Sequence, residues 1–273
     1  MSGEHAADLA LAMDAARRAG AAVMRHFGRE LDVTYKTPAQ PLTAADLEAD
    51  ALLYETLIGA RPAYGWLSEE TVDTPDRLAC SRVWIVDPID GTRSFIARLP
   101  EFTVSVGLAE DGVPIAGVVF NPARDELFHA VRGGGAYVEV QGGRAERLRV
   151  STHPVDDRVT LLTSRTELAA GDLDPFREGW HFEPTGSTAY KLARVAWSRG
   201  EAFLSRGPKS EWDICAGVLL VREAGGCVTD MDGADLRFNG ADPYVHGIVA
   251  AHGALHGVLR QRLAALPPAR RLT

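Results

Sequence analysis

The chain has 273 residues, of which 46% are hydrophobic and 24% charged, with a formal net charge of -8. This length suits one large domain or two packed subdomains of an ordinary globular protein. The negative charge argues against a nucleic acid polymer or a membrane surface as partner. We see no apolar run near ~18 residues, no signal peptide and no Cys-x-x-Cys pair, so a reduced, cytoplasmic location is expected.

The first part of the chain predicts two amphipathic helices. An apolar stripe of 3.6-residue period runs from Leu9 to Phe27, and Gly28 is placed to end that helix. A polar link over residues 36–41 comes next. Thr43 then suits an N-cap, with Asp46 three residues on, and the second helix is expected to end near residues 59–62.

Short β-rich runs dominate from residue 64 to residue 150, and Asp111-Gly112 reads as a hairpin turn between two of them. Strands and helices alternate afterwards, with helices expected over 187–198 and 212–224 and a last one ending near residue 266. The sequence therefore predicts two subdomains, residues 1–150 and 151–273, that are both mixed α/β or α+β. The predicted strands cover residues 64–67, 83–86, 103–108, 115–120, 127–131, 136–140, 159–163, 202–204, 228–230 and 248–251.

The most informative segment is the predicted strand over residues 83–86 together with residues 87–92. Asp87 and Asp90 come directly after the apolar run, and Gly91 and Thr92 come after them. Carboxylates bind hard divalent cations, and backbone N–H groups freed at a strand end bind phosphate. Two metal ions at such a site stabilise the attacking and leaving oxygens of an in-line displacement. The segment predicts metal-assisted phosphoryl chemistry.

Three further acidic positions lie beside apolar elements, and each also has a purely structural explanation. Asp46 suits a capping box, Glu69-Glu70 suits a solvated turn, and Asp213 suits the start of a helix. Asp87 and Asp90 resist such an explanation, because Pro88 fixes the backbone between them.

These motifs resemble those of the inositol monophosphatase family of Mg²⁺-dependent, Li⁺-inhibited phosphomonoesterases. Residues 87–92, Asp-Pro-Ile-Asp-Gly-Thr, match its first signature. Trp212-Asp213 with Ala216-Gly217 and residues 223–226 match its second. Residues 68–70 match its acidic turn, and Lys36 with residues 41–43 and Asp46 resembles its first acidic motif. The resemblance implies an α+β fold, a layered α/β/α/β/α sandwich of two subdomains, and a homodimer.

The resemblance also implies a set of metal ligands. Glu69, Asp87 and the Ile89 carbonyl would hold one Mg²⁺, while Asp87, Asp90 and Asp213 would hold a second. A third, weaker ion would use Glu69 and water. The expected cofactor is therefore two or three Mg²⁺ ions.

The same resemblance implies catalytic roles. Glu69 and Thr92 would orient a metal-activated water, with Asp46 hydrogen-bonded to Thr92 as its proton partner. The N–H groups of Gly91 and Thr92 would receive the phosphate of a small phosphorylated metabolite.

Residues on the far side of the site are expected to bind the part of the substrate beyond the phosphate. Gly186, Ser187 and Thr188 resemble the family's substrate loop. Arg206 stands where animal inositol monophosphatases carry an acid that binds inositol hydroxyls, and a guanidinium suits a second phosphate. Lys209 would add charge, as would Lys191, although each of these three cations also suits a solvated surface.

We therefore expect a 3'(2'),5'-bisphosphate nucleotidase that converts 3'-phosphoadenosine 5'-phosphate to AMP. The alternatives are an inositol-1-monophosphatase and then a fructose-1,6-bisphosphatase. A hypothesis of another class is a metal-binding regulatory protein that keeps the fold without turnover.

Overall fold

Strands whose residues are buried on both faces build the centre of the larger of two main sheets. The computed structural model describes residues 3–37, 40–156, 158–177 and 179–266, and its larger sheet has seven strands in the order β3-β4-β5-β6-β7-β8-β9. The β3–β4 pair is parallel and the remaining pairs are antiparallel. The strands are β3 (Gly65–Ser68), β4 (Arg82–Asp90), β5 (Thr103–Glu110), β6 (Val113–Asn121), β7 (Glu126–Val131), β8 (Gly135–Val140) and β9 (Glu146–Arg147).

The smaller sheet has five strands in the order β11-β10-β12-β14-β13, mixing parallel and antiparallel pairs. These strands are β10 (Thr160–Thr163), β11 (His181–Pro184), β12 (Ala202–Ser210), β13 (Cys227–Thr229) and β14 (Tyr244–Ala251). A separate hairpin pairs β1 (Thr34–Thr37) with β2 (Gln40–Leu42).

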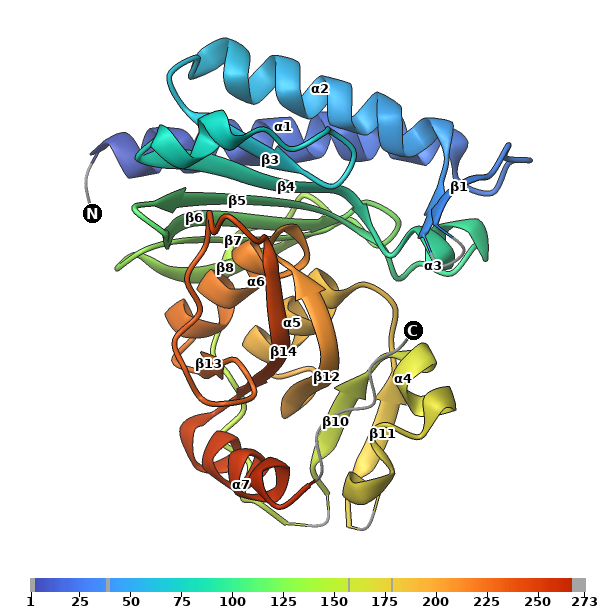
Figure 1. Cartoon of the computed structure of the whole chain (residues 1–273), viewed down its shortest axis with the longest axis vertical. Helices are drawn as coiled ribbons and strands as arrows, with labels where there is room; N and C mark the ends of the chain where they lie inside the picture. Colours follow the sequence, from blue (N-terminus) through green and yellow to red (C-terminus); the bar gives the residue numbers. More distant parts are fainter. Residues whose placement is uncertain (1–2, 38–39, 157, 178, 267–273) are drawn as a thin grey trace.

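The helices separate and cover the sheets, which gives the α/β/α/β/α layering expected for the fold class (Figure 1). The helices α1 and α2 cover the outer face of the larger sheet, α5 and α6 lie between the two sheets, and α7 packs against β13 and β14 of the smaller sheet. Short helices lie in the connections. The helices are α1 (Gly3–His26), α2 (Ala44–Ala60), α3 (Thr92–Ile96), α4 (Arg165–Ala170), α5 (Thr188–Ala196), α6 (Glu211–Glu223) and α7 (Gly253–Ala264), with 3₁₀ turns η1 (Pro75–Ala79) and η2 (Asp174–Phe176).

The middle layer joins the two sheets through one continuous core. Ile85 and Phe128 of the larger sheet belong to the same buried cluster as Phe203 and Ile248 of the smaller sheet, with α5 and α6 between them. The division at residue 150 stays a prediction. None of the described helices has the length and apolar character needed to cross a membrane.

The helix α6 lies very close to the larger sheet because two strand positions are glycine. A Cβ at Gly107 would lie 2.6 Å from Cys215 Sγ, and one at Gly117 would lie 3.0 Å from Ala216 Cα. The first distance is shorter than real Cβ atoms show, and the second is tighter than most real Cβ contacts, so the two glycines set the depth at which α6 packs. This helix carries Asp213 in its first turn.

Candidate active site

A pocket of ≈ 560 Å³ lies where the larger sheet meets the middle helices. Most of the predicted site residues line this pocket, whereas Asp46 and Arg206 do not. The lining residues from the prediction are Glu69, Asp87, Ile89, Asp90, Gly91, Thr92, Gly186, Ser187, Thr188, Lys209 and Asp213.

The end of β4 brings two carboxylates to the pocket. The strand runs four residues past the predicted end at Val86, because Asp87 pairs with Ser105 and Asp90 with Thr103 of β5. The register shifts between these pairs, and Pro88, which cannot donate a ladder hydrogen bond, lies within the shift. The chain turns at Gly91, whose φ of +98° and 2.9 Å Cβ distance to Glu101 O require glycine.

Three carboxylates converge in the pocket. One oxygen each of Glu69, Asp87 and Asp213 lies within 4.8 Å of the other two. Burial raises the pKa of Asp87 well above its usual range, and the charges of Glu69, Asp90 and Asp213 raise it further. The pKa of Asp213 is raised in the same way by burial and by Asp90 and Glu69. These carboxylate oxygens lie close together with little positive charge nearby, which suits the binding of a hard divalent cation such as Mg²⁺.

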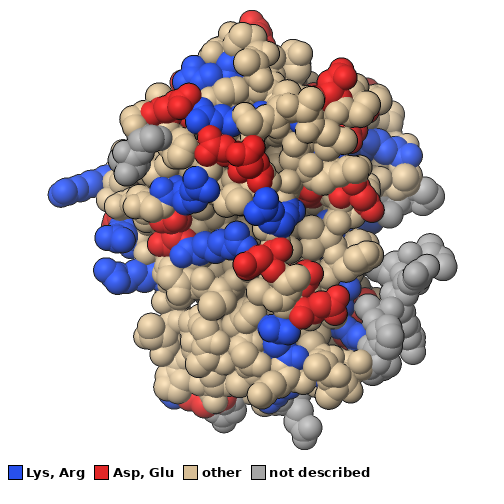
Figure 2. All heavy atoms as spheres, turned by 60° about the vertical axis from the view of Figure 1, so that its left-hand side comes forward, with Lys and Arg blue, Asp and Glu red and all other residues tan. Residues whose placement is uncertain are grey.

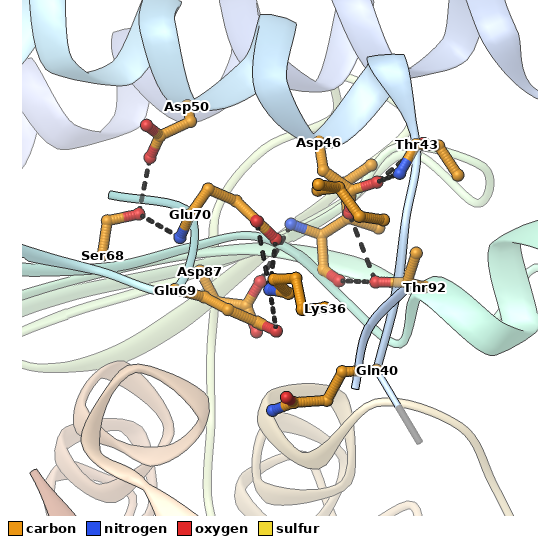
Figure 3. Close-up of polar contacts among 12 residues, drawn as sticks. Lys36, Gln40, Thr43, Asp46, Asp50, Ser68, Glu69, Glu70, Asp87 and Thr92 are labelled. Atoms are coloured by element: carbon orange, nitrogen blue, oxygen red, sulfur yellow. Dashed lines mark hydrogen bonds and ion pairs between the residues drawn. The ribbon is translucent and has the colours of Figure 1, made fainter. Parts of the chain in front are cut away.

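Asp46 comes from the start of α2 and points toward Thr43 and Thr92 (Figure 3). It is buried and does not line the pocket. It forms the predicted capping box at the start of α2, accepting from Thr43 N at 2.8 Å and Thr43 Oγ1 at 2.6 Å. Its other oxygen is 3.3 Å from Thr92 Oγ1, which is also 3.0 Å from the Ile89 carbonyl. Burial raises the pKa of Asp46, against the hydrogen bonds from Thr43. The capping role and the contact with Thr92 therefore coexist.

Lys36 reaches the acidic turn from the hairpin β1–β2 (Figure 3). Its ammonium lies 2.8 Å from Glu69 Oε1 and 3.0 Å from both carboxylate oxygens of Glu70. Even so, burial and the charge of Glu69 raise the pKa of Glu70 to about 7. The single positive charge of Lys36 therefore only partly balances the negative charge of Glu69 and Glu70.

The start of α5 reaches across the pocket to β4. Ser187 Oγ donates to Asp90 Oδ2 at 2.6 Å, and Ala189 N donates to the same oxygen at 2.6 Å. Ser187 Oγ also accepts from Tyr190 N and so caps α5. Gly186 has to be glycine, because a Cβ there would lie 2.1 Å from Ser94 Oγ.

The far side of the site differs from the predicted one. The Arg206 guanidinium donates to the Asp172 carbonyl at 3.3 Å, while Lys209 lines the pocket. Sequence reasoning missed Glu167, a buried acid of α4 that also lines the pocket. Its Oε1 accepts from Ser205 Oγ and from the N–H groups of Arg206 and Gly207. Unlike Asp87, this acid does not follow a predicted strand directly, because three residues separate it from the end of the strand predicted over residues 159–163.

Acidic and basic side chains are interspersed on the face shown in Figure 2. The charge on this face is mixed rather than gathered into a basic band, in keeping with the net charge of -8. The face in this view therefore does not offer the continuous basic band that would suit a polymeric anion.

Comparison with known proteins identifies the fold and chemistry together. The model of the inositol monophosphatase family matches residues 5–267. The chain belongs to the inositol monophosphatase family. Membership makes it a phosphoric monoester hydrolase of a metal-dependent family that acts on small phosphorylated substrates, as the motifs of residues 36–226 indicated.

Relatives in the inositol monophosphatase family carry more than one name. An inositol-1-monophosphatase of Mesorhizobium japonicum is 38% identical over 84% of this chain and 88% of its own length. A histidinol-phosphatase of Mycobacterium tuberculosis is 34% identical over 94% of this chain and 98% of its own. Among solved structures, the extragenic suppressor protein suhB of Bartonella henselae superposes with a TM-score of 0.81 at 32% identity, covering 95% of this chain and 99% of that one.

Proposed function

We propose that the protein is a Mg²⁺-dependent phosphatase of small polyol monophosphates of the inositol-1-phosphate type. The observation that carries this proposal is the convergence of Glu69, Asp87 and Asp213 in the pocket. Support for the substrate comes from the similarity to a protein named inositol-1-monophosphatase. This substrate replaces the bisphosphate nucleotide as our preferred one.

The metal would be held by Glu69, Asp87, Asp90, Asp213 and the carbonyl of Ile89. When bound, Mg²⁺ supplies Lewis acidity and neutralises the charge on the phosphate oxygens. The raised pKa values of Asp87 and Asp213 support this ligand set, because each reflects carboxylate charge that the protein leaves uncompensated.

Thr92 and Asp46 would accept the proton of the attacking water. The water oxygen forms a bond to phosphorus as the bond from phosphorus to the alcohol oxygen breaks. The proton of the water passes through Thr92 Oγ1 to Asp46, and the released alcohol oxygen takes a proton from solvent. Thr92 Oγ1 accepts a hydrogen bond from the water and donates to Asp46, which lies 3.3 Å away. Because burial raises the pKa of Asp46, its carboxylate is a better base than an exposed aspartate would be.

The far wall argues against a second phosphate. Arg206, which the sequence predicts to bind a second phosphate, donates to the Asp172 carbonyl instead. It is not among the described residues that line the pocket. Glu167 stands in that wall, and a carboxylate repels a phosphate dianion while accepting hydrogen bonds from hydroxyl groups. Lys209 adds positive charge to the pocket lining, as do Arg93, Arg165 and Lys191. Of these, Arg165 pairs with Glu101, and Lys191 donates to two backbone carbonyls.

A substrate panel tests the proposal. The kcat/KM values for inositol-1-phosphate, 3'-phosphoadenosine 5'-phosphate and fructose-1,6-bisphosphate are measured with Mg²⁺. We expect the highest value for inositol-1-phosphate and loss of all activity in EDTA. A preference for the bisphosphates would restore the nucleotidase hypothesis. Turnover of none would favour the regulatory protein.

Variants of the ligands test the chemistry independently of the substrate. Asp90→Asn and Asp213→Asn should fold normally and lose at least about 100-fold in kcat, because each removes a negative charge from the metal site. Asp235→Asn is a matched control, since Asp235 is 90% exposed and pairs only loosely with Arg222 at 3.7 Å. Full activity in the Asp90→Asn and Asp213→Asn variants would contradict the proposed metal site.

A further inference from the structure

Lys191 is an unusual residue for its position, because it is a charged side chain with 3% exposure in the middle layer. Its ammonium lies 5.3 Å from the centre of the Phe203 ring, and the residue also lines the active-site pocket. Burial lowers its pKa to about 8. A buried lysine costs stability unless its donors are used.

The donors of Lys191 go to the turn that precedes α5. Its Nζ donates to the Thr185 carbonyl at 3.1 Å and to the Ser187 carbonyl at 2.8 Å. These two carbonyls flank Gly186, so one ammonium fixes both ends of the turn. The contact links a side chain on α5 to the backbone that enters it.

The turn needs such support because Ser187 has a strained backbone. Its φ is +58° and its ψ is 125°, a region that side-chain-bearing residues rarely adopt. Strain of this kind persists only where the surroundings impose it, and it is concentrated at functional sites. Glycine would relieve it, but glycine lacks the hydroxyl that bonds Asp90 at 2.6 Å.

We infer that Lys191 is a positioning residue that holds Ser187 in this conformation and thereby orients Asp90 for the metal. Both bonds to Asp90 Oδ2, from Ser187 Oγ and from Ala189 N, come from the segment that the ammonium fixes. The inference rests on the proposed role of Asp90 as a metal ligand.

The direction in which Mg²⁺ affinity changes distinguishes a positioning role of Lys191 from a purely electrostatic effect of its charge. Removing a positive charge near a cation site should tighten Mg²⁺ binding by Coulomb's law. Removing a residue that orients a ligand should weaken it, by about 10- to 100-fold. Lys191→Met keeps an unbranched side chain that is one atom shorter, and it removes the ammonium with its donors and its charge. We therefore expect a higher Mg²⁺ dissociation constant by calorimetry in the full-length protein.

Three further variants complete the experiment. Lys209→Met removes another pocket lysine, whose Nζ donates to the Pro208 carbonyl beside it at 3.4 Å, so it should not weaken Mg²⁺ binding. Lys191→Arg keeps donors and charge and should recover part of the affinity. Ser187→Gly removes the hydroxyl, and its effect should not add to that of Lys191→Met, because both act through one contact.

Each outcome decides the inference. Equal or tighter Mg²⁺ binding in Lys191→Met, or full additivity with Ser187→Gly, overturns it. Asp90→Asn is measured alongside, and unchanged Mg²⁺ affinity in that variant means that the proposed metal site itself has failed. Should Lys191→Met not fold by circular dichroism, Lys191→Gln takes its place in the same cycle.

Discussion

Single residues in this site combine a structural contact with a proposed chemical role. Asp46 and Asp213 are both the third residue of a helix whose capping box they complete. The structural and functional explanations that the sequence left open are therefore compatible, since each carboxylate has two oxygens. The helix start fixes the carboxylate, and burial raises its pKa.

Replacing Thr92 tests the proton path at the scale of one hydroxyl. Thr92→Ala should lower kcat by about 100-fold or more, the range of general acid–base contributions. Thr92→Ser keeps the hydroxyl and should restore most of kcat. Rates are compared at saturating substrate and Mg²⁺, and an alanine variant as active as the serine variant would exclude Thr92 from the proton path.

Glu70 gives the metal-free protein a pH-dependent stability. Its pKa is raised from 4.5 to about 7, so the folded state binds its proton more tightly than the unfolded state does. This stabilisation is complete below about pH 4.5 and is lost as the pH rises through about 7. In EDTA, the fall in Tm between pH 5 and pH 8 should be smaller for Glu70→Gln than for the wild type. An equal fall would assign the effect to other groups.

At the scale of elements, disrupting the close packing of α6 on the larger sheet should lower the free energy of unfolding. Gly117→Ala should destabilise the protein by about 1–3 kcal/mol, because its Cβ would meet the α6 backbone at 3.0 Å. It should also weaken Mg²⁺ binding, since α6 carries Asp213. Denaturant unfolding and calorimetry measure the two effects.

Gly59→Ala is the control for that substitution. Gly59 lies inside α2 with no atom within 4 Å of an added Cβ, so alanine should stabilise it by about 0.5–1 kcal/mol. The same chemical change would then have opposite signs at two positions. Two destabilising results would point to a general effect rather than to the contact with α6.

The long elements were predictable because their patterns are periodic, and the short ones were not. The sequence placed α2 at its N-cap Thr43 and located the β5–β6 turn at Asp111-Gly112. It ended β12 at Leu204, whereas the strand continues to Ser210 through a Gly-Pro pair. That extension depends on β14, which pairs with it across a register shift, and a partner strand leaves no local signal.

The site was predictable to the same extent. Residues that come after strong strands, such as Asp87 and Asp90, were recognisable, and the pocket contains them. Glu167 was missed because α4 has only six residues, too few for a periodic pattern. Arg206 was placed by its spacing from Asp213, but spacing along β12 does not determine which way a side chain points near an irregular register.

At the scale of the whole molecule, Arg77 joins segments that lie far apart in the sequence. Its guanidinium is buried and donates to Asn239 Oδ1 at 2.7 Å and to the Gly240 carbonyl at 3.0 Å. Glu211, two residues before Asp213, accepts from the N–H groups of the same two residues. The start of α6 is thus connected to η1 across the chain.

Arg77→Met should therefore destabilise the whole protein. The change removes the donors to Asn239 and Gly240 and to both carboxylate oxygens of Asp73. An acceptor left unpaired in a buried site costs about 1–3 kcal/mol, and less where water reaches it, as at the half-buried Asn239 and Gly240. Unfolding should remain a single transition, because one core spans both sheets. Two separate transitions in a calorimetric scan would contradict that shared core.

The short helix α4 has a consequence for how new specificities arise on this scaffold. It contributes Glu167 to the pocket from a segment of six residues that carries none of the proposed metal ligands. Substitutions there would change which alcohol is accepted while the hydrolytic machinery stays intact. Directed evolution confined to residues 164–170 is therefore a direct route to phosphatases with other substrates.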